Sequence, residues 1–312
     1  MSHSIEVIAP GVACAHGKIV NFYYVGEPGG PWVLVDTGMP LGAPSIIRTA
    51  EERFGKDSRP EAIVLTHAHF DHVGSVKALA DHWDVPIYVH RMEEPFVTGR
   101  ADYPPFDPTV GGFFPALSRT FPEKGIDLGD RVRLLPGSGP VDIMPGWDIH
   151  HTPGHAPGHV SFFRESDGVL IVGDAFITMD TDSFRDTVTQ KPEITRPPSY
   201  ATCDWDAARD SVQRLASLRP KVVGTGHGRP LSGPSVADDL ETLARTFHRP
   251  AHGRYVNQPA RFDQNGVVSI PPPVHDPVPA IAAGVGAAAL AGVAIAAVRR
   301  HQAEMDLEDE DE

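Results

Sequence analysis

The chain has few cysteines and few basic residues, and each shortage excludes a class of protein. Only Cys14 and Cys203 occur among 312 residues, which excludes a disulfide framework and a cysteine-rich zinc module. The 27 lysines and arginines are outnumbered by 41 aspartates and glutamates, and the net charge is −14. Because this charge repels a phosphate backbone, we expect no nucleic-acid partner.

The N-terminus also lacks the pattern of an export signal, since Met1-Ser-His-Ser-Ile-Glu-Val-Ile holds no basic stretch followed by an apolar run.

Hydrophobic residues make up 41% of the chain, which is enough for a packed core. Histidine is also abundant, with 16 residues. Many histidines beside few cysteines favour metal sites built from imidazole and carboxylate groups.

Composition predicts four successive regions: a folded domain over 1–250, an extension with a Pro-rich spacer over 251–279, an apolar segment over 280–298 and an acidic tail over 299–312. The apolar segment just reaches the roughly 20 residues that a membrane-spanning helix needs. It also lacks the polar face of a soluble helix. We therefore expect one transmembrane helix that attaches the chain to a membrane, with the folded domain on the cytoplasmic side. A soluble cytoplasmic protein is the alternative.

Within the folded domain, β-like runs outnumber helical patterns, which predicts packed sheets with helices outside them. Residues 91–130 fit neither period, and they predict a long loop or cap rich in Pro, Gly and Phe. The predicted helices are Ala43–Phe54, Val73–Ala80, Trp205–Leu218 and Ser235–Phe247. The predicted strands are Lys18–Val25, Trp32–Val35, Ala62–Leu65, Ile87–Val89, Val132–Leu135, Asp148–His151, Val160–Phe163, Val169–Val172 and Val222–Val223.

Four possible metal ligands follow the apolar run Ile63–Leu65 within six residues: His67, His69, Asp71 and His72. They require a loop, because a helix or a strand would point them in different directions. Imidazole and carboxylate together suit zinc, iron or manganese. A solvated His-rich loop would be the plain alternative if this cluster stood alone.

Three further candidates occur where other predicted strands meet loops. His155 lies in the glycine–proline turn of Thr152-Pro-Gly-His, Asp174 follows Gly173, and His227 lies between Gly226 and Gly228. Ligands placed at strand ends can all line one edge of a sheet core. The sequence therefore predicts a metal centre assembled from loops that are distant along the chain.

In this order, the HxHxDH, TPGH, GD and GHG motifs over about residues 5–230 resemble the metallo-β-lactamase fold superfamily, including its lactonase-like and glyoxalase II-like members. The resemblance implies an α+β fold, a four-layer αββα sandwich. It also implies two divalent metal ions, which we expect to be Zn²⁺, with iron or manganese as alternatives. The implied ligands are His67, His69 and His155 for one ion, Asp71, His72 and His227 for the other, and Asp174 as the bridge.

The resemblance assigns further roles around these ligands. Asp36, in an Asp-Thr-Gly turn, would support the metal loop, and Asp71 would also act catalytically by assisting proton transfer to the leaving group. His159 lies just past the turn of His155, and we expect it to support the site through hydrogen bonds. Phe70 would form an apolar wall of the substrate pocket, with packing under the loop as the alternative.

The resemblance implies a hydrolase in which a metal-bridging hydroxide attacks the carbonyl of a small-molecule ester, lactone or thioester. One alternative is a mononuclear iron enzyme like the persulfide dioxygenases, in which His67, His155 and Asp174 hold the iron. A phosphodiesterase or nuclease is a lesser alternative, disfavoured by the lack of a basic cluster. The identity of the metal distinguishes the first two, and the oligomeric state stays open.

Overall fold

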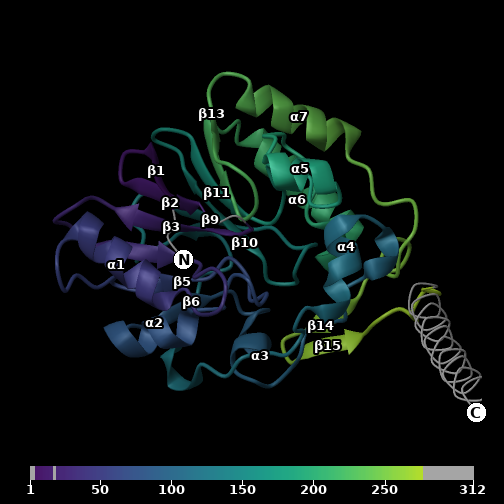
Figure 1. Ribbon diagram of the computed structural model, residues 1–312, viewed down its shortest axis with the longest axis horizontal. Coiled ribbons are helices and arrows are strands. Elements are labelled where there is room, and N and C mark those ends of the chain that lie inside the picture. The colour runs from purple at the N-terminus through teal and green to yellow at the C-terminus, as the bar shows by residue number, and fades with distance from the viewer. Residues whose placement is uncertain (1–3, 17–18, 277–312) are drawn as a thin grey trace, which may run out of the picture. The chain divides into compact units, whose positions relative to one another are not determined.

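The computed structural model describes residues 4–16 and 19–276 (Figure 1). The chain divides into two compact units, Met1–Pro273 and Val274–Glu312. All the helices and strands of the described residues lie in the first unit. They include a hairpin of β14 (Arg261–Asp263) and β15 (Gly266–Ser269), so most of the extension expected after residue 250 folds together with the domain.

The first of two large sheets follows the order of the sequence from β1 to β7. Neighbours from β1 to β4 are antiparallel, and those from β4 to β7 are parallel. The sequence did not predict β1 or β2. The strands are β1 (Ser4–Ala9), β2 (Val12–His16), β3 (Asn21–Gly26), β4 (Trp32–Val35), β5 (Ile63–Val64), β6 (Ile87–Val89) and β7 (Val132–Leu134).

The second sheet has the order β13-β12-β11-β10-β9-β8. Its neighbours are antiparallel except for β11 and β12, so β9, β11 and β12 run in one direction. The strands are β8 (Gly139–Pro140), β9 (Asp148–His151), β10 (Val160–Arg164), β11 (Val169–Gly173), β12 (Val222–Thr225) and β13 (Leu231–Ser232).

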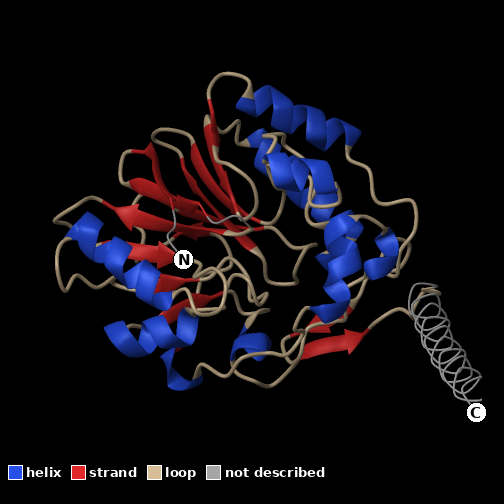
Figure 2. Ribbon diagram, in the orientation of Figure 1, coloured by secondary structure: helices blue, strands red, loops and turns tan. Residues whose placement is uncertain are grey.

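Alternation along the strands builds the layers seen in Figure 2. In β4, Leu34 packs with the outer helices α1 (Ala43–Phe54) and α2 (Val76–Trp83), whereas the next residue, Val35, packs between the two sheets. In β11, Ile171 lies between the sheets, and its neighbours face α6 (Trp205–Ser217) and α7 (Val236–Thr246). The predicted helix–sheet–sheet–helix sandwich is confirmed.

Residues 91–130 are not one long loop, because short helices interrupt them. The segment holds α3 (Glu94–Val97) and α4 (Phe113–Leu117), besides single 3₁₀ turns. It packs through its aromatic side chains, and the periodicity of the sequence could not reveal this packing. A further short helix, α5 (Phe184–Thr189), also went unpredicted.

In the part of the chain that the structure describes, no helix has the length and apolar character needed to cross a membrane. The predicted transmembrane segment 280–298 and the acidic tail 299–312 lie outside the described residues.

Candidate metal centre

The topology brings the carboxyl ends of six strands to the candidate site. The parallel strands β4, β5 and β6 are followed by Asp36, by the loop that starts at Thr66, and by a turn that reaches Glu93. In the second sheet, β9, β11 and β12 share a direction and are followed by His155, Asp174 and His227. Side chains far apart in sequence therefore meet at one edge of the sandwich.

The seven predicted ligands come together in groups whose ligand atoms lie within 4.8 Å of one another. All seven are buried, with exposures of 6% or less. Asp174 lies between the groups, because its Oδ2 is 3.0 Å from His227 Nε2 and 3.5 Å from the Nε2 atoms of His72 and His155. The groups are His67, His69 and His155; His67, His72 and Asp174; and Asp71, His72 and His227.

Hydrogen bonds hold three of the histidine rings by Nδ1, so Nε2 is the ring nitrogen that remains on the side of the other candidate ligands. Such bonds fix the tautomer and the orientation of a ring, as they do for histidines that hold metals. The pairs are His67 Nδ1 with Thr66 Oγ1 at 3.0 Å, His72 Nδ1 with Asp36 Oδ2 at 2.8 Å, and His227 Nδ1 with the carbonyl of Ile19 at 2.6 Å.

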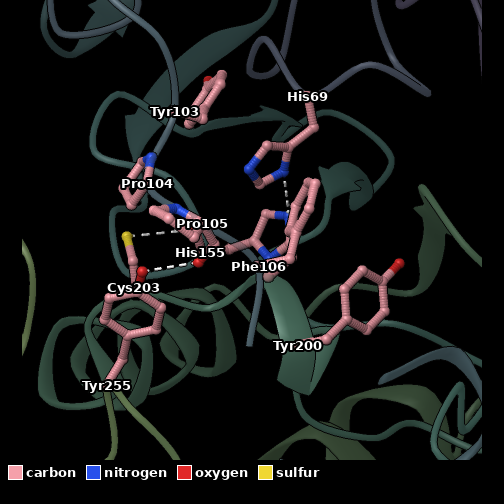
Figure 3. Close-up of a pocket in the computed structure, with 10 residues that line it drawn as sticks. His69, Tyr103, Pro104, Pro105, Phe106, His155, Tyr200, Cys203 and Tyr255 are labelled. Atoms are coloured by element: carbon pink, nitrogen blue, oxygen red, sulfur yellow. Dashed lines mark hydrogen bonds between the residues drawn. The ribbon is translucent and has the colours of Figure 1, made fainter. Parts of the chain in front are cut away.

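Several buried polar atoms at this edge have no hydrogen-bond partner: His67 Nε2, His72 Nε2 and Asp174 Oδ1. His69 Nδ1 faces His155 Nε2 at 2.9 Å, as Figure 3 shows. Among the described residues, no Lys or Arg forms an ion pair with Asp71 or Asp174. Buried carboxylates and unpaired ring nitrogens are costly without a partner, so this donor set fits divalent cations.

The electrostatics of the site separate its two sides. Burial alone would lower the pKa values of His72 and His227, but the Asp174 carboxylate outweighs it and raises both above the ordinary value. Burial and the neighbouring histidines lower the pKa of His69 to about 3 and hold the pKa values of His67 and His155 well below the ordinary range. These rings are therefore neutral, which is the form that ligates metals. Burial opposes the charge of Asp174, but His227 and His72 outweigh it and hold the pKa of Asp174 well below its usual value.

Asp36 binds the ligand loop from behind. Its Oδ1 accepts the backbone N–H of Thr66 at 2.8 Å, and its Oδ2 accepts the Thr66 hydroxyl and His72 Nδ1, each at 2.8 Å. Asp36 has a φ of 60°, a left-handed conformation that aspartate tolerates better than most residues. This turn aims the carboxylate at the loop, and support of bound metal by Asp36 stays a prediction.

His159 orients Asp174 through the backbone. Its Nε2 accepts the N–H of Asp174 at 2.8 Å, and its Nδ1 lies 2.9 Å from Thr152 Oγ1. Burial lowers the pKa of His159 to about 3, so the ring is neutral and keeps an acceptor nitrogen. The contact joins His159 to the backbone of a candidate ligand, and its supporting role stays a prediction.

Phe70 is half-buried and packs against two rings of the cap. Its centroid lies 5.2 Å from that of Phe121 and 6.3 Å from that of Phe106. We call this cluster the aromatic wall. Its members are Phe70, Phe106, Val110, Phe113, Phe114, Phe121, Tyr200 and Ala201.

A narrow cavity beside His69 and His155 connects the site to the cap (Figure 3). Its volume of about 10 Å³ admits roughly one water molecule. The cap contributes Tyr103, Pro104, Pro105 and Phe106, and the C-terminal extension contributes Tyr255, whose hydroxyl donates to the carbonyl of Pro105 at 2.7 Å.

Sequence reasoning missed three residues that hold the ligand loops. Glu93 and Tyr103 contact the backbone of Ala68, and Asn21 donates to the carbonyls of Thr225 and Gly228 around His227. Glu93 follows a predicted strand closely, and this position was the one feature of the sequence that could have indicated a role at the site. Tyr103 and Asn21 had none, because their partners are distant in sequence.

Comparison with known proteins decides the family. The model of the metallo-beta-lactamase superfamily matches residues 17–227, more than half of the chain. The chain belongs to this superfamily. The relative "Probable metallo-hydrolase YflN" of Bacillus subtilis is 43% identical over 239 residues, which cover 76% of this chain and 90% of that protein. A second B. subtilis protein, "Probable metallo-hydrolase YybB", is 27% identical over 195 residues, 62% of this chain and 74% of that one.

Among solved structures, the archaeal metallo-beta-lactamase superfamily protein ST1585 from Sulfolobus tokodaii has a TM-score of 0.51 and 23% identity. The match covers 76% of this chain and 86% of that chain. This likeness supports the superfamily fold that the layers show.

Proposed function

We propose that the protein is a dinuclear metallo-hydrolase that cleaves an ester, lactone or thioester of a small molecule. The observation that carries the proposal is the pair of ligand groups on either side of Asp174, each with unpaired donor atoms. The likeness to YflN, itself named a probable metallo-hydrolase, supports the same class. We propose Zn²⁺ as the metal, because the groups combine imidazole and carboxylate.

His67, His69 and His155 would hold one ion, Asp71, His72 and His227 the other, and Asp174 both. Ions bound here would bring the pKa of a bound water close to neutrality and would polarise a carbonyl group. Asp71 would pass a proton to the leaving group; its burial, with 6% exposure, and its position beside the other candidate ligands, with Oδ2 3.5 Å from His227 Nε2, support this role.

The surroundings of the site favour an apolar acyl group. The aromatic wall lies next to the ligands, and the ring centroids of Phe106 and His69 are 5.5 Å apart. The cavity holds only about 10 Å³, less than an organic substrate needs, and we propose that the cap moves when a substrate enters. We therefore propose substrates that combine a hydrolysable carbonyl with an apolar chain or ring.

A substrate panel tests this function on the zinc-loaded protein. Lactones, aryl esters and thioesters with apolar acyl groups should be hydrolysed, and phosphodiesters should not. Turnover of phosphodiesters alone would contradict the proposed substrates and identify the protein as a phosphodiesterase. Oxygen uptake with a persulfide substrate, in protein holding about one iron per chain, would replace the hydrolase with a dioxygenase.

A further inference from the structure

Glu93 is a fully buried carboxylate that lies outside the predicted ligand set and joins two of the ligand loops. It follows β6, and its exposure is 0%. Its Oε2 accepts the backbone N–H of Ala68 at 3.0 Å, and its Oε1 accepts the N–H of Gly158 at 2.6 Å. A buried carboxylate with these partners is a costly feature that a simple packing role does not require.

The two N–H groups lie next to the ligands of one ion. Ala68 separates His67 from His69, and Gly158 lies three residues after His155. One side chain therefore fixes the distance between the two loops that supply all three histidines of this group, which we call the tri-histidine group. The close approach requires glycine at 158, because a Cβ there would lie 2.7 Å from Glu93 Cγ.

Tyr103 completes the arrangement from the cap. Its hydroxyl donates to Glu93 Oε2 and accepts the N–H of Ala68 at 3.1 Å. Its ring lies over His69, with centroids 4.5 Å apart. The carboxylate thus joins three segments: two ligand loops and the cap.

The other group shares the loop of Ala68 through Asp71 and His72, but its two histidine rings are held by different residues. Asp36 binds His72, and the carbonyl of Ile19 binds His227. Asn21 holds the loop around His227 through the carbonyls of Thr225 and Gly228. None of the contacts of Glu93 described here reaches the loop of His227.

We propose that Glu93 is a positioning residue that sets the geometry of the tri-histidine group and leaves the Asp71, His72 and His227 group largely unaffected. The proposal rests on the proposed function only in taking both groups as metal sites. It predicts a selective effect: loss of Glu93 weakens one metal-binding step by roughly 10- to 100-fold, the range seen for residues that orient metal ligands.

The test is Zn²⁺ binding to the metal-free full chain, measured by competition with a chromophoric chelator. Glu93→Gln is made in two backgrounds that isolate the groups, His227→Ala for the tri-histidine group and His69→Ala for the other. Glu93→Gln should weaken zinc binding in the His227→Ala background and leave it unchanged in the His69→Ala background. Glu123→Gln is the matched control, since Glu123 also accepts a backbone N–H, that of Phe106 at 3.2 Å, but contacts neither ligand loop.

Equal weakening in both backgrounds would mean a general loss of structure and would overturn the proposal, as would no change in either. If Glu93→Gln fails to fold, Tyr103→Phe keeps the carboxylate, removes one of its donors and should give a smaller effect with the same selectivity. A wild-type chain that binds no zinc would instead contradict the proposed function, so the two failures are distinguishable.

Discussion

Asp174 lies between the tri-histidine group and the group of Asp71, His72 and His227, and we propose that its side chain lets two ions share the site. Its Oδ2 approaches Nε2 atoms on both sides at 3.0 to 3.5 Å. Asp174→Asn keeps the volume but loses the charge, and we expect it to lower metal content and to reduce kcat/KM by about 100-fold or more. Asp167→Asn, in the exposed turn between β10 and β11, is the control and should change neither quantity. Wild-type activity in Asp174→Asn would show that Asp174 is not part of the metal site.

Phe70 offers a second test at the scale of single residues, because it is the member of the aromatic wall that lies within the HxHxDH motif. Phe70→Ala should reduce kcat/KM about 10-fold for substrates with long apolar acyl groups, because an apolar contact with the acyl group is lost. The value of kcat/KM for acetyl substrates should change much less, and Phe70→Leu should retain most of the wild-type kcat/KM for the long substrates. A uniform reduction across acyl lengths would contradict a role in substrate binding.

At the scale of elements, the loop after β12 has to pass very close to the metal ligands. A Cβ at Gly226 would lie 2.0 Å from Asp174 Oδ1 and 2.7 Å from His72 Cε1. Gly226→Ala should therefore displace these ligands and reduce kcat/KM by about 100-fold, with loss of bound metal. Gly137→Ala is the control, since no atom lies within 4 Å of a Cβ there. Metal content and activity equal to wild type in Gly226→Ala would contradict this placement of the loop.

The elements also show how far the sequence could predict the molecule. The inner strands and the four main helices were predictable, because each is a continuous apolar pattern with a clear period. The meeting of the seven candidate ligands at one edge of the sandwich was also predictable, because they follow those strands within short motifs. Glu93, Tyr103 and Asn21 were not, since each acts by contacting the backbone of another segment. The cap over residues 91–130 was expected, but its short helices were not, because its packing depends on aromatic contacts across the fold rather than on periodicity.

At the scale of the whole molecule, we propose that residues 280–298 attach the protein to a membrane, with the catalytic domain on the cytoplasmic side. The segment has 19 residues and no charged side chain. The full chain should sediment with membranes and resist an alkaline wash, whereas a chain ending at Pro279 should stay in the supernatant and keep its activity. Full-length protein that remains in the supernatant would contradict the anchor.

The number and identity of bound metal ions test the central claim most directly. The full chain, purified without added metal or chelator, is measured by elemental mass spectrometry. Two groups of unpaired donors around Asp174 predict close to two zinc ions per chain. About one iron per chain, or no bound metal, would contradict a dinuclear zinc hydrolase.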